Sequence, residues 1–244
     1  MFPSHPGFEG SLSLAPVVSD SSASNVSEAH TPGSAASEAR GTLYKRPLDL
    51  AILLAAHLAL APVFLVLWAV IPLLVWVEDR GPVFYRQHRP GKGGRLFTIL
   101  KFRTMVVNAD KIGPAWTQDK DPRVTRVGKV LRRTALDELP SILSIWKGDM
   151  SFVGPRALPV KEQQLLEQQI PGFAGRLNVR PGLTGMAQVY DLKDEAPTKL
   201  RYDLEYIRCM NLLLDVKLIL MSARNTLMGR WDVRTGKKGM EKPS

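Results

Sequence analysis

Two adjacent carboxylates lie among basic residues in the segment RRTALDELPSILSIWKGDMSFVGPR, which covers residues 132–156. Asp137 and Glu138 follow Arg132 and precede Arg156 in this segment. Carboxylates at a helix start are common as caps, because they accept hydrogen bonds from free backbone N–H groups. Carboxylates surrounded by arginines can also take part in the chemistry of an anionic substrate. The segment therefore poses a choice between a structural and a catalytic pair.

The position of Pro140 indicates where the helix that carries these carboxylates begins. If Thr134 were the N-cap, Asp137 would complete a capping box, but Pro140 would break the ladder at the sixth helical position. If Asp137 is the N-cap, Pro140 falls in the first turn, where no hydrogen bond is lost. We therefore predict a helix that begins at Asp137 and directs its positive end at the carboxylates and at bound anions.

Adjacent residues on a helix do not face one another, so Asp137 and Glu138 are unsuited to share one proton. They can instead divide the work on a diphosphate, with one carboxylate binding magnesium and the other attacking phosphorus. A glycosidase is disfavoured, because its two carboxylates face each other across roughly 5–10 Å. From the residues alone, the cap and the nucleophile remain equally open interpretations.

Further cations accompany a predicted β-hairpin. Residues 83–87 and 96–102 are β-prone, and the Gly-rich stretch HRPGKGG between them indicates a turn. Most basic side chains of this hairpin are expected on a solvated or lipid-facing surface. Lys101 and Arg103 alternate with Phe102, so we expect them to share one face of a strand and to bind one phosphate together.

Helical patterns dominate the second half of the chain. Residues 160–169 predict a surface helix, and residues 198–228 have extended helical character with apolar residues at 3- and 4-residue spacings. The part over residues 212–228 is apolar on most of its circumference, which suits either the membrane interface or the domain core. The stretches VGPR (153–156) and RPGLTG (180–185) indicate turns.

The apolar run Leu50–Val77 contains 28 residues without a charged side chain, which favours contact with a membrane. Pro62 near its middle removes a backbone N–H and breaks the helical ladder, and Pro72 is expected to do so again. His57 is costly at the membrane midplane unless it finds a partner. Basic residues flank both ends of the run, and such residues prefer the cytoplasmic side. We therefore favour a re-entrant helix, broken at Pro62, over a kinked spanning helix.

Charge is unevenly distributed over the 244 residues, whose formal net charge is +10. Residues 1–41 have a net charge of −3, which leaves +13 for the remainder. A basic body favours anionic partners such as nucleic acid, phosphorylated metabolites or an acidic membrane surface. The serine-rich residues 1–41 predict a disordered tail. The single cysteine, Cys209, cannot form an intrachain disulfide, which fits a reducing compartment.

The sequence resembles the bacterial sugar transferase family, the monotopic polyprenyl-phosphate phosphoglycosyl transferases that initiate surface-glycan assembly. The resemblance runs from about Tyr44 to Leu227. The sequence looks like the short form of the family, which lacks the multi-pass N-terminal membrane domain of larger relatives. It rests on motifs in the family's order: KRPLDL, GPVFYRQHRPG, ILKFRTM, DPRVTRVGKVLRRTALDELPSI, WKGDMSFVGPR, VRPGLTGMAQV and YDLEYI.

The resemblance implies transfer of a phospho-sugar from a nucleotide diphosphate sugar, usually a UDP-sugar, to undecaprenyl phosphate. The products would be a polyprenyl diphosphate-linked sugar and UMP, and the cofactor would be magnesium. The family's motif implies Asp137 as the nucleophile, with a covalent phospho-sugar intermediate, and Glu138 as the magnesium ligand. It implies that phosphates are bound by Arg132, Arg156 and Arg180.

We therefore expect a predominantly α protein with a small β-hairpin, an α+β fold, on the cytoplasmic face of the bacterial inner membrane. The expected partners are the nucleotide sugar, undecaprenyl phosphate and the phospholipid membrane, and no nucleic acid is expected. The expected organisation is a disordered tail over residues 1–41, a re-entrant membrane helix with its flanks over 42–79, a catalytic domain with interfacial helices over 80–230 and a C-terminal tail over 231–244.

Three positions depart from the family's pattern. Ala61 stands where a serine usually precedes the helix-breaking proline, Ala157 replaces the proline usual after GPR, and Met186 replaces a tryptophan. Ala61 bears on which groups donate hydrogen bonds to the backbone carbonyls freed at the break. Ala157 bears on the rigidity of the loop that carries Arg156, and Met186 bears on an aromatic contact.

Two alternatives remain beside this interpretation. The main one is a basic membrane-anchored protein that binds nucleic acid or acidic lipid, in which Asp137 and Glu138 are structural. The other is direct displacement, in which the lipid phosphate attacks the donor and the carboxylates serve only the metal.

Overall fold

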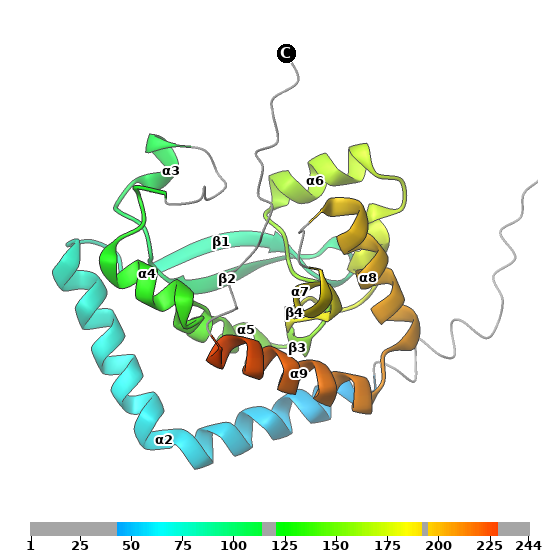
Figure 1. Ribbon diagram of the computed structural model, residues 1–244, viewed down its shortest axis with the longest axis horizontal. Coiled ribbons are helices and arrows are strands. Elements are labelled where there is room, and N and C mark those ends of the chain that lie inside the picture. The colour runs from blue at the N-terminus through cyan, green and yellow to red at the C-terminus, as the bar shows by residue number, and fades with distance from the viewer. Residues whose placement is uncertain (1–42, 114–120, 192–194, 229–244) are drawn as a thin grey trace, which may run out of the picture. The chain divides into compact units, whose positions relative to one another are not determined.

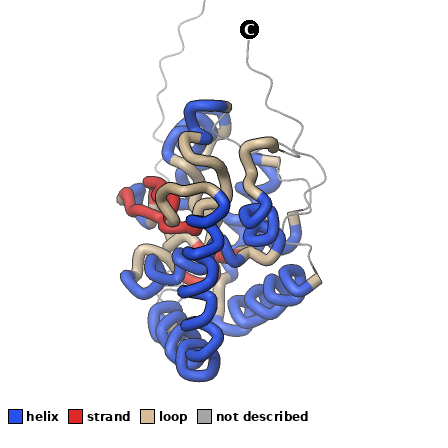
Figure 2. Tube along the Cα trace, turned by 90° about the vertical axis from the view of Figure 1, so that its left-hand side faces the viewer, coloured by secondary structure: helices blue, strands red, loops and turns tan. Residues whose placement is uncertain are grey.

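The structure is a computed structural model that describes residues 43–113, 121–191 and 195–228. The tails expected over residues 1–41 and 231–244 lie outside this part. Most of the described chain is helical, and its strands are short (Figure 2). Its elements are, in order, α2 (Lys45–Glu78), β1 (Phe84–Pro90), η1 (Lys92–Gly94), β2 (Leu96–Phe102), α3 (Ala109–Ile112), α4 (Arg126–Arg133), η2 (Leu136–Ser141), α5 (Ile142–Lys147), β3 (Ser151–Val153), α6 (Val160–Gln169), η3 (Phe173–Asn178), β4 (Gly182–Thr184), α7 (Met186–Tyr190), α8 (Ala196–Cys209) and α9 (Leu212–Leu227).

Helix α2 is long, apolar and bent (Figure 1). Its backbone leaves helical geometry at Leu60, with φ −115° and ψ 18°, two residues before Pro62. This position lies within the turn before Pro62, where a proline's missing N–H and its ring disturb the helical ladder. Pro72 stands inside the same helix without such a departure, so the second break expected there is not found.

The two arms of α2 pack into different clusters of the core. Leu53 of the first arm packs in a buried cluster that includes Phe97 of β2. Ile71 of the second arm packs in another cluster, with Phe102 at the end of the same strand. Both arms therefore pack against the part of the chain that carries the hairpin. The basic residues that flank the apolar run lie at the ends of these two arms.

Apolar side chains remain exposed around the bend between these arms. Leu58 and Leu65 are both 74% exposed. His57 finds partners here, since its Nδ1 lies 2.7 Å from the carbonyl oxygen of Leu53 and its ring stacks on Phe64 across the bend. By length and composition, α2 is the one helix among the described residues that could cross a membrane.

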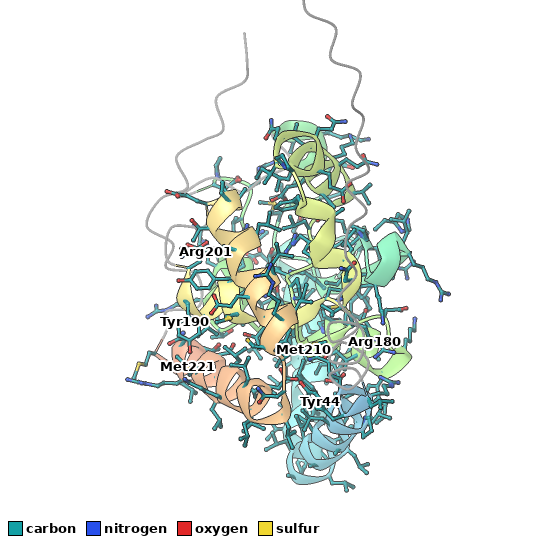
Figure 3. The ribbon with its side chains drawn as sticks, turned by 90° about the vertical axis from the view of Figure 1, so that its right-hand side faces the viewer. Tyr44, Arg180, Tyr190, Arg201, Met210 and Met221 are labelled. Carbon is teal, nitrogen blue, oxygen red and sulfur yellow. The ribbon has the colours of Figure 1, made fainter. Side chains whose placement is uncertain are left out.

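The first turn of α2 is tied to the body by a buried polar cluster. Lys45 Nζ donates to Asp215 Oδ2 at 2.8 Å and to the carbonyl of Val153 at 2.8 Å. Tyr44, labelled at the start of α2 in Figure 3, donates its hydroxyl to the same Asp215 oxygen at 2.9 Å. Tyr206 of α8 donates to the other Asp215 oxygen at 2.7 Å. Asp215 therefore joins α2, α8 and α9 beside strand β3.

The predicted hairpin is confirmed, although β1 extends to Pro90. Strands β1 and β2 pair antiparallel, with Phe84 opposite Phe102, and η1 fills the Gly-rich turn with Gly93 at φ 65°. A second pair, β3 and β4, is parallel and was not predicted. Its strands have three residues each, too few for a hydrophobic period to reveal them.

The surface helix predicted over residues 160–169 is confirmed as α6, whereas the long helix predicted over 198–228 is two helices. The break falls at Asn211, which caps α9 by accepting a hydrogen bond from the amide of Leu214 at 2.9 Å. One face of α9 is in the core, where Leu218 is fully buried, while Leu213 on another face is 81% exposed.

Candidate active site

The two carboxylates lie in the 3₁₀ helix η2, between α4 and α5. After α4 ends, Ala135 adopts φ 56° and ψ 14° and acts as the N-cap of η2. Asp137 and Glu138 therefore lie in the first turn. The prediction that Asp137 itself is the N-cap is wrong, because the left-handed turn at Ala135 places the N-cap two residues earlier. Such backbone conformations of non-glycine residues cost about 1–3 kcal/mol and concentrate at functional sites.

Glu138 is held by two cations that come from other elements. Its Oε1 accepts a hydrogen bond from Lys101 Nζ of β2 at 2.6 Å and another from Arg156 Nη2, in the loop after β3, at 2.7 Å. Burial alone would raise the pKa of Glu138, but the charges of Arg156 and Lys101 outweigh it and hold the pKa well below its usual range. Glu138 is therefore a fixed, ionised carboxylate at physiological pH.

Asp137 has a different environment, although it is the preceding residue. Its side chain is half-buried and, among the described residues, makes no hydrogen bond or ion pair. Burial is the largest influence and raises the pKa of Asp137 to about 6, against the lowering effect of Lys101. A carboxylate with a raised pKa and no fixed partner is well suited to act as a nucleophile.

Arg132 adds a third cation to this site. It lies in the last turn of α4, and its Nε donates to Thr104 Oγ1 at 2.9 Å. Its charge lowers the pKa of Asp137, as do those of Lys101 and Arg156. The structure thus brings together five of the residues predicted for the site: Lys101, Arg132, Asp137, Glu138 and Arg156.

Arg103 faces a different carboxylate. Its Nη1 lies 3.4 Å from Asp79 Oδ2, and its Nη2 donates to the carbonyl of Asp79 at the C-terminal end of α2. Lys101 and Arg103 therefore contact different carboxylates in this structure, and their binding of one phosphate stays a prediction. Strand β2 ends at Phe102, so the strict alternation that would place both side chains on one face does not continue to Arg103.

Arg180 lies near the first turn of α2. Burial is the largest cause that lowers the pKa of Lys45, and the nearby positive charge of Arg180 lowers it further. Figure 3 labels Arg180 close to Tyr44. Binding of a phosphate by Arg180 stays a prediction.

The loop that carries Arg156 is held against the turn that follows Arg180. Gly154 N donates to the carbonyl of Thr184 at 2.9 Å, and Gly182 N donates to the carbonyl of Pro155 at 3.0 Å. A Cβ atom on Gly182 would overlap the backbone of Gly154, so a glycine is required for this close approach. The two turns seen in the sequence, VGPR and RPGLTG, thus form one structural unit.

Two further arginines that the sequence did not assign to the site bind the same loop. Arg89 Nη1 donates to the carbonyl of Ala157, and Arg176 Nη2 donates to the carbonyl of Arg156 at 2.8 Å. Arg89 was expected on a solvated or lipid-facing surface with the rest of the hairpin. No local pattern distinguishes Arg89 or Arg176 from other basic residues, because their partners are distant in sequence.

The carboxylates retain oxygens suited to a magnesium ion. Both cations bind Oε1 of Glu138, and among the described residues no hydrogen bond engages its Oε2 or either oxygen of Asp137. The same residues contain no cluster of three or more His, Cys, Asp or Glu side chains that could hold a metal by themselves. This donor set fits an ion bound by one or two carboxylates and completed by substrate phosphates, as magnesium is.

A family model described as bacterial sugar transferase matches residues 40–229, which include every residue of the site. The chain belongs to the bacterial sugar transferase family.

Relatives of this bacterial sugar transferase cover much of the chain. A UDP-N-acetylgalactosamine-undecaprenyl-phosphate N-acetylgalactosaminephosphotransferase of Aeromonas hydrophila is 40% identical over 189 residues, 76% of this chain and 44% of its own length. A UDP-glucose:undecaprenyl-phosphate glucose-1-phosphate transferase of Caulobacter vibrioides is 39% identical over 191 residues, 76% of this chain and 70% of its own length. The exopolysaccharide production protein ExoY of Sinorhizobium fredii is 37% identical over 195 residues, 73% of this chain and 83% of its own length. The chain thus matches less than half of the Aeromonas protein, but most of the other two.

Proposed function

We propose that this bacterial sugar transferase transfers a phospho-sugar from a UDP-sugar to undecaprenyl phosphate and releases UMP, in the first membrane step of surface polysaccharide assembly. The observation that carries the proposal is the unequal pair of carboxylates, since Glu138 is bound by Lys101 and Arg156 while Asp137 has no fixed partner among the described residues. The substrates are inferred from the Aeromonas and Caulobacter relatives, whose names give a UDP-sugar and undecaprenyl phosphate.

In the proposed first step, a carboxylate oxygen of Asp137 attacks the β-phosphorus of the donor. The bond between this phosphorus and the bridging oxygen of the diphosphate breaks, and UMP leaves with the electron pair. The protein then carries the sugar phosphate as an acyl-phosphate on Asp137. The charges of Lys101, Arg132 and Arg156 surround Asp137 and would compensate the negative charge that develops on the phosphoryl oxygens.

In the proposed second step, an oxygen of undecaprenyl phosphate attacks the same phosphorus. The bond to Asp137 breaks, the carboxylate is regenerated and the polyprenyl diphosphate-linked sugar leaves. Two steps avoid a direct encounter between two strongly anionic substrates, which would repel one another at the membrane surface. Each step needs a nucleophile that is ionised but not neutralised by an ion pair, as Asp137 is in this site.

Magnesium is the proposed cofactor, with Glu138 as its ligand. When bound, it would neutralise charge on the diphosphate and on the departing UMP. Lys101 and Arg156 hold Glu138 by a single oxygen. They would thereby leave the second oxygen of Glu138 available to the ion while keeping the carboxylate ionised.

For the membrane helix we propose a re-entrant course, with the catalytic body on the cytoplasmic face of the inner membrane. Three observations support it: the bend at Leu60, the packing of both arms against the same body and the exposed apolar residues around the bend. The basic residues at both ends of the run would then lie on one side of the membrane, as the charge rule favours.

The proposed activity is tested by a panel of nucleotide sugars with undecaprenyl phosphate and magnesium, using the full chain in native membranes. UMP release that requires one donor and the magnesium ion supports the proposal. If folded protein releases no UMP with any donor, the proposal is contradicted in favour of a basic membrane-anchored binding protein with structural carboxylates.

A further inference from the structure

Arg176 has an uncommon environment for a charged side chain. It is 2% exposed, and its Nε and Nη2 lie 2.9 and 2.7 Å from the same oxygen of Asp203. Its Nη1 donates to Gln163 Oε1 at 3.2 Å. Burial of such an ion pair costs desolvation, and well-packed apolar side chains often give equal or greater stability. The stability of the fold therefore does not by itself explain why an ion pair stands here.

One hydrogen bond of Arg176 leads from this buried pair to the active site. Its Nη2 donates to the main-chain carbonyl of Arg156 at 2.8 Å, and Arg156 Nη2 donates to Glu138 Oε1 at 2.7 Å. Asp203 on α8 is thus linked to Glu138 through Arg176 of η3 and Arg156 of the loop after β3. Arg176 binds the main chain of Arg156, and the side chain of Arg156 binds Glu138.

We propose that Arg176, oriented by Asp203, is a positioning residue that fixes the main chain at Arg156 and so sets its guanidinium against Glu138. This inference rests on the proposed function of Asp137 and Glu138 as the reacting pair. The physical reason is the length of the Arg156 side chain. A small rotation of the backbone at Arg156 displaces its guanidinium group by a much larger distance. A misplacement of about 1 Å in an active site can cost about 100-fold in rate.

A purely structural role makes a different prediction. If Arg176 only satisfies a buried carbonyl, its loss lowers stability and affects the reaction independently of Arg156. If Arg176 acts through Arg156, its loss removes most of what Arg156 contributes, and the two effects on rate are not additive. A double-mutant cycle therefore separates these roles.

The test replaces the pair by apolar residues of similar size, Arg176→Met with Asp203→Leu, in the full chain in membranes. We expect kcat to fall about 10- to 100-fold. We expect Arg156→Lys to cost a comparable factor in the wild type, but less than about 3-fold in the background without the pair. The proposal is overturned if Arg156→Lys costs the same factor in both backgrounds.

A matched control is provided by Arg123 and Asp121, a second buried ion pair with Nη2 and Oδ2 2.7 Å apart. Arg123→Met with Asp121→Leu removes a pair of the same kind. Among the described residues, the main-chain carbonyl that Arg123 binds is that of Ala109 rather than one in the loop of Arg156. In this background Arg156→Lys should cost the same factor as in the wild type. If the Arg176–Asp203 variant fails to fold, Asp203→Asn, which keeps the shape and one acceptor, replaces it in the same cycle.

Amide hydrogen exchange tests the inference by a measurement that does not depend on enzymatic activity. Amides over residues 154–158 should exchange at least about tenfold faster without the Arg176–Asp203 pair, and at the wild-type rate in the Arg123–Asp121 control. Equal exchange in all three proteins would overturn the inference. If the wild type releases no UMP with any donor but the exchange differs as expected, the proposed function fails while the positioning of Arg156 stands.

Discussion

Asp137 and Glu138 are adjacent in η2, yet the pKa of Asp137 is raised to about 6 while that of Glu138 is held well below its usual range. The cause is the unequal distribution of cations, because Lys101 and Arg156 both donate to Glu138 Oε1. The site therefore contains one carboxylate with fixed partners and one that can form a new bond.

The rate of the first step should fall at acidic pH, because only ionised Asp137 attacks. With a pKa of about 6, kcat/KM should be half its plateau near pH 6 and fall about tenfold per pH unit below it. Glu138 stays ionised over this range and adds no second limb. Initial rates of UMP release between pH 5 and pH 8 measure the profile. A rate that stays constant down to pH 5 would contradict the assignment of Asp137.

Asp137→Asn should stabilise the fold while it abolishes turnover. The folded-state pKa lies above the unfolded value of about 3.9, so the folded protein binds more protons between about pH 4 and pH 6. The contribution of this carboxyl is therefore favourable below pH 4 and is lost as pH rises through 6. At pH 7.5 the asparagine variant should be about 1–3 kcal/mol more stable, at the lower end because the side chain is half-buried. Thermal unfolding should show this gain at pH 7.5 and almost none near pH 4.

Glu138→Gln should have the opposite effect on stability. The neutral amide leaves Lys101 and Arg156 without their counter-charge in a buried site, and breaking a buried pair in this way costs about 3–5 kcal/mol. Thermal unfolding of the two single variants, side by side at pH 7.5, measures the contrast. Two variants that shift the melting temperature in the same direction would show that the two carboxylates do not differ as described.

A re-entrant α2 predicts that both ends of the helix are accessible from the cytoplasm. Single cysteines at Leu43 and Arg86, both exposed, should react with an impermeant thiol reagent only from that side in a Cys209→Ser background. A cysteine at Leu65, which is 74% exposed in the structure, should be shielded by lipid and serve as the control. Labelling of Leu43→Cys from the outside would establish a spanning helix instead.

Local sequence patterns were sufficient for the elements whose signals are local. The hairpin followed from two β-prone runs and a Gly-rich turn, and the bend in α2 lies two residues before Pro62. Asn211 before an apolar run is a local N-cap signal for the break between α8 and α9. The apolar spacing over residues 198–228 nevertheless predicted one continuous helix. Pro72 shows the reverse case, since a proline signal was present and the helix continues.

The partners of the carboxylates could not be predicted from the sequence, because they depend on tertiary contacts. Lys101 is 37 residues from Glu138 in the chain, and its neighbour Arg103 pairs with Asp79 instead. Arg176 and Asp203 carry no motif, and only the packing of η3 against α8 reveals their contact with the loop of Arg156.

The most direct test of the central claim is incubation of the wild-type protein with magnesium and a labelled UDP-sugar, in the absence of undecaprenyl phosphate. A two-step reaction predicts that the protein acquires one sugar phosphate, that mass spectrometry of peptides places it on Asp137 and that an equal amount of UMP is released. Asp137→Asn should acquire none, and addition of undecaprenyl phosphate should remove the label from the wild type. A protein that stays unlabelled and releases UMP only when the lipid is present would contradict the covalent role of Asp137 and establish direct displacement.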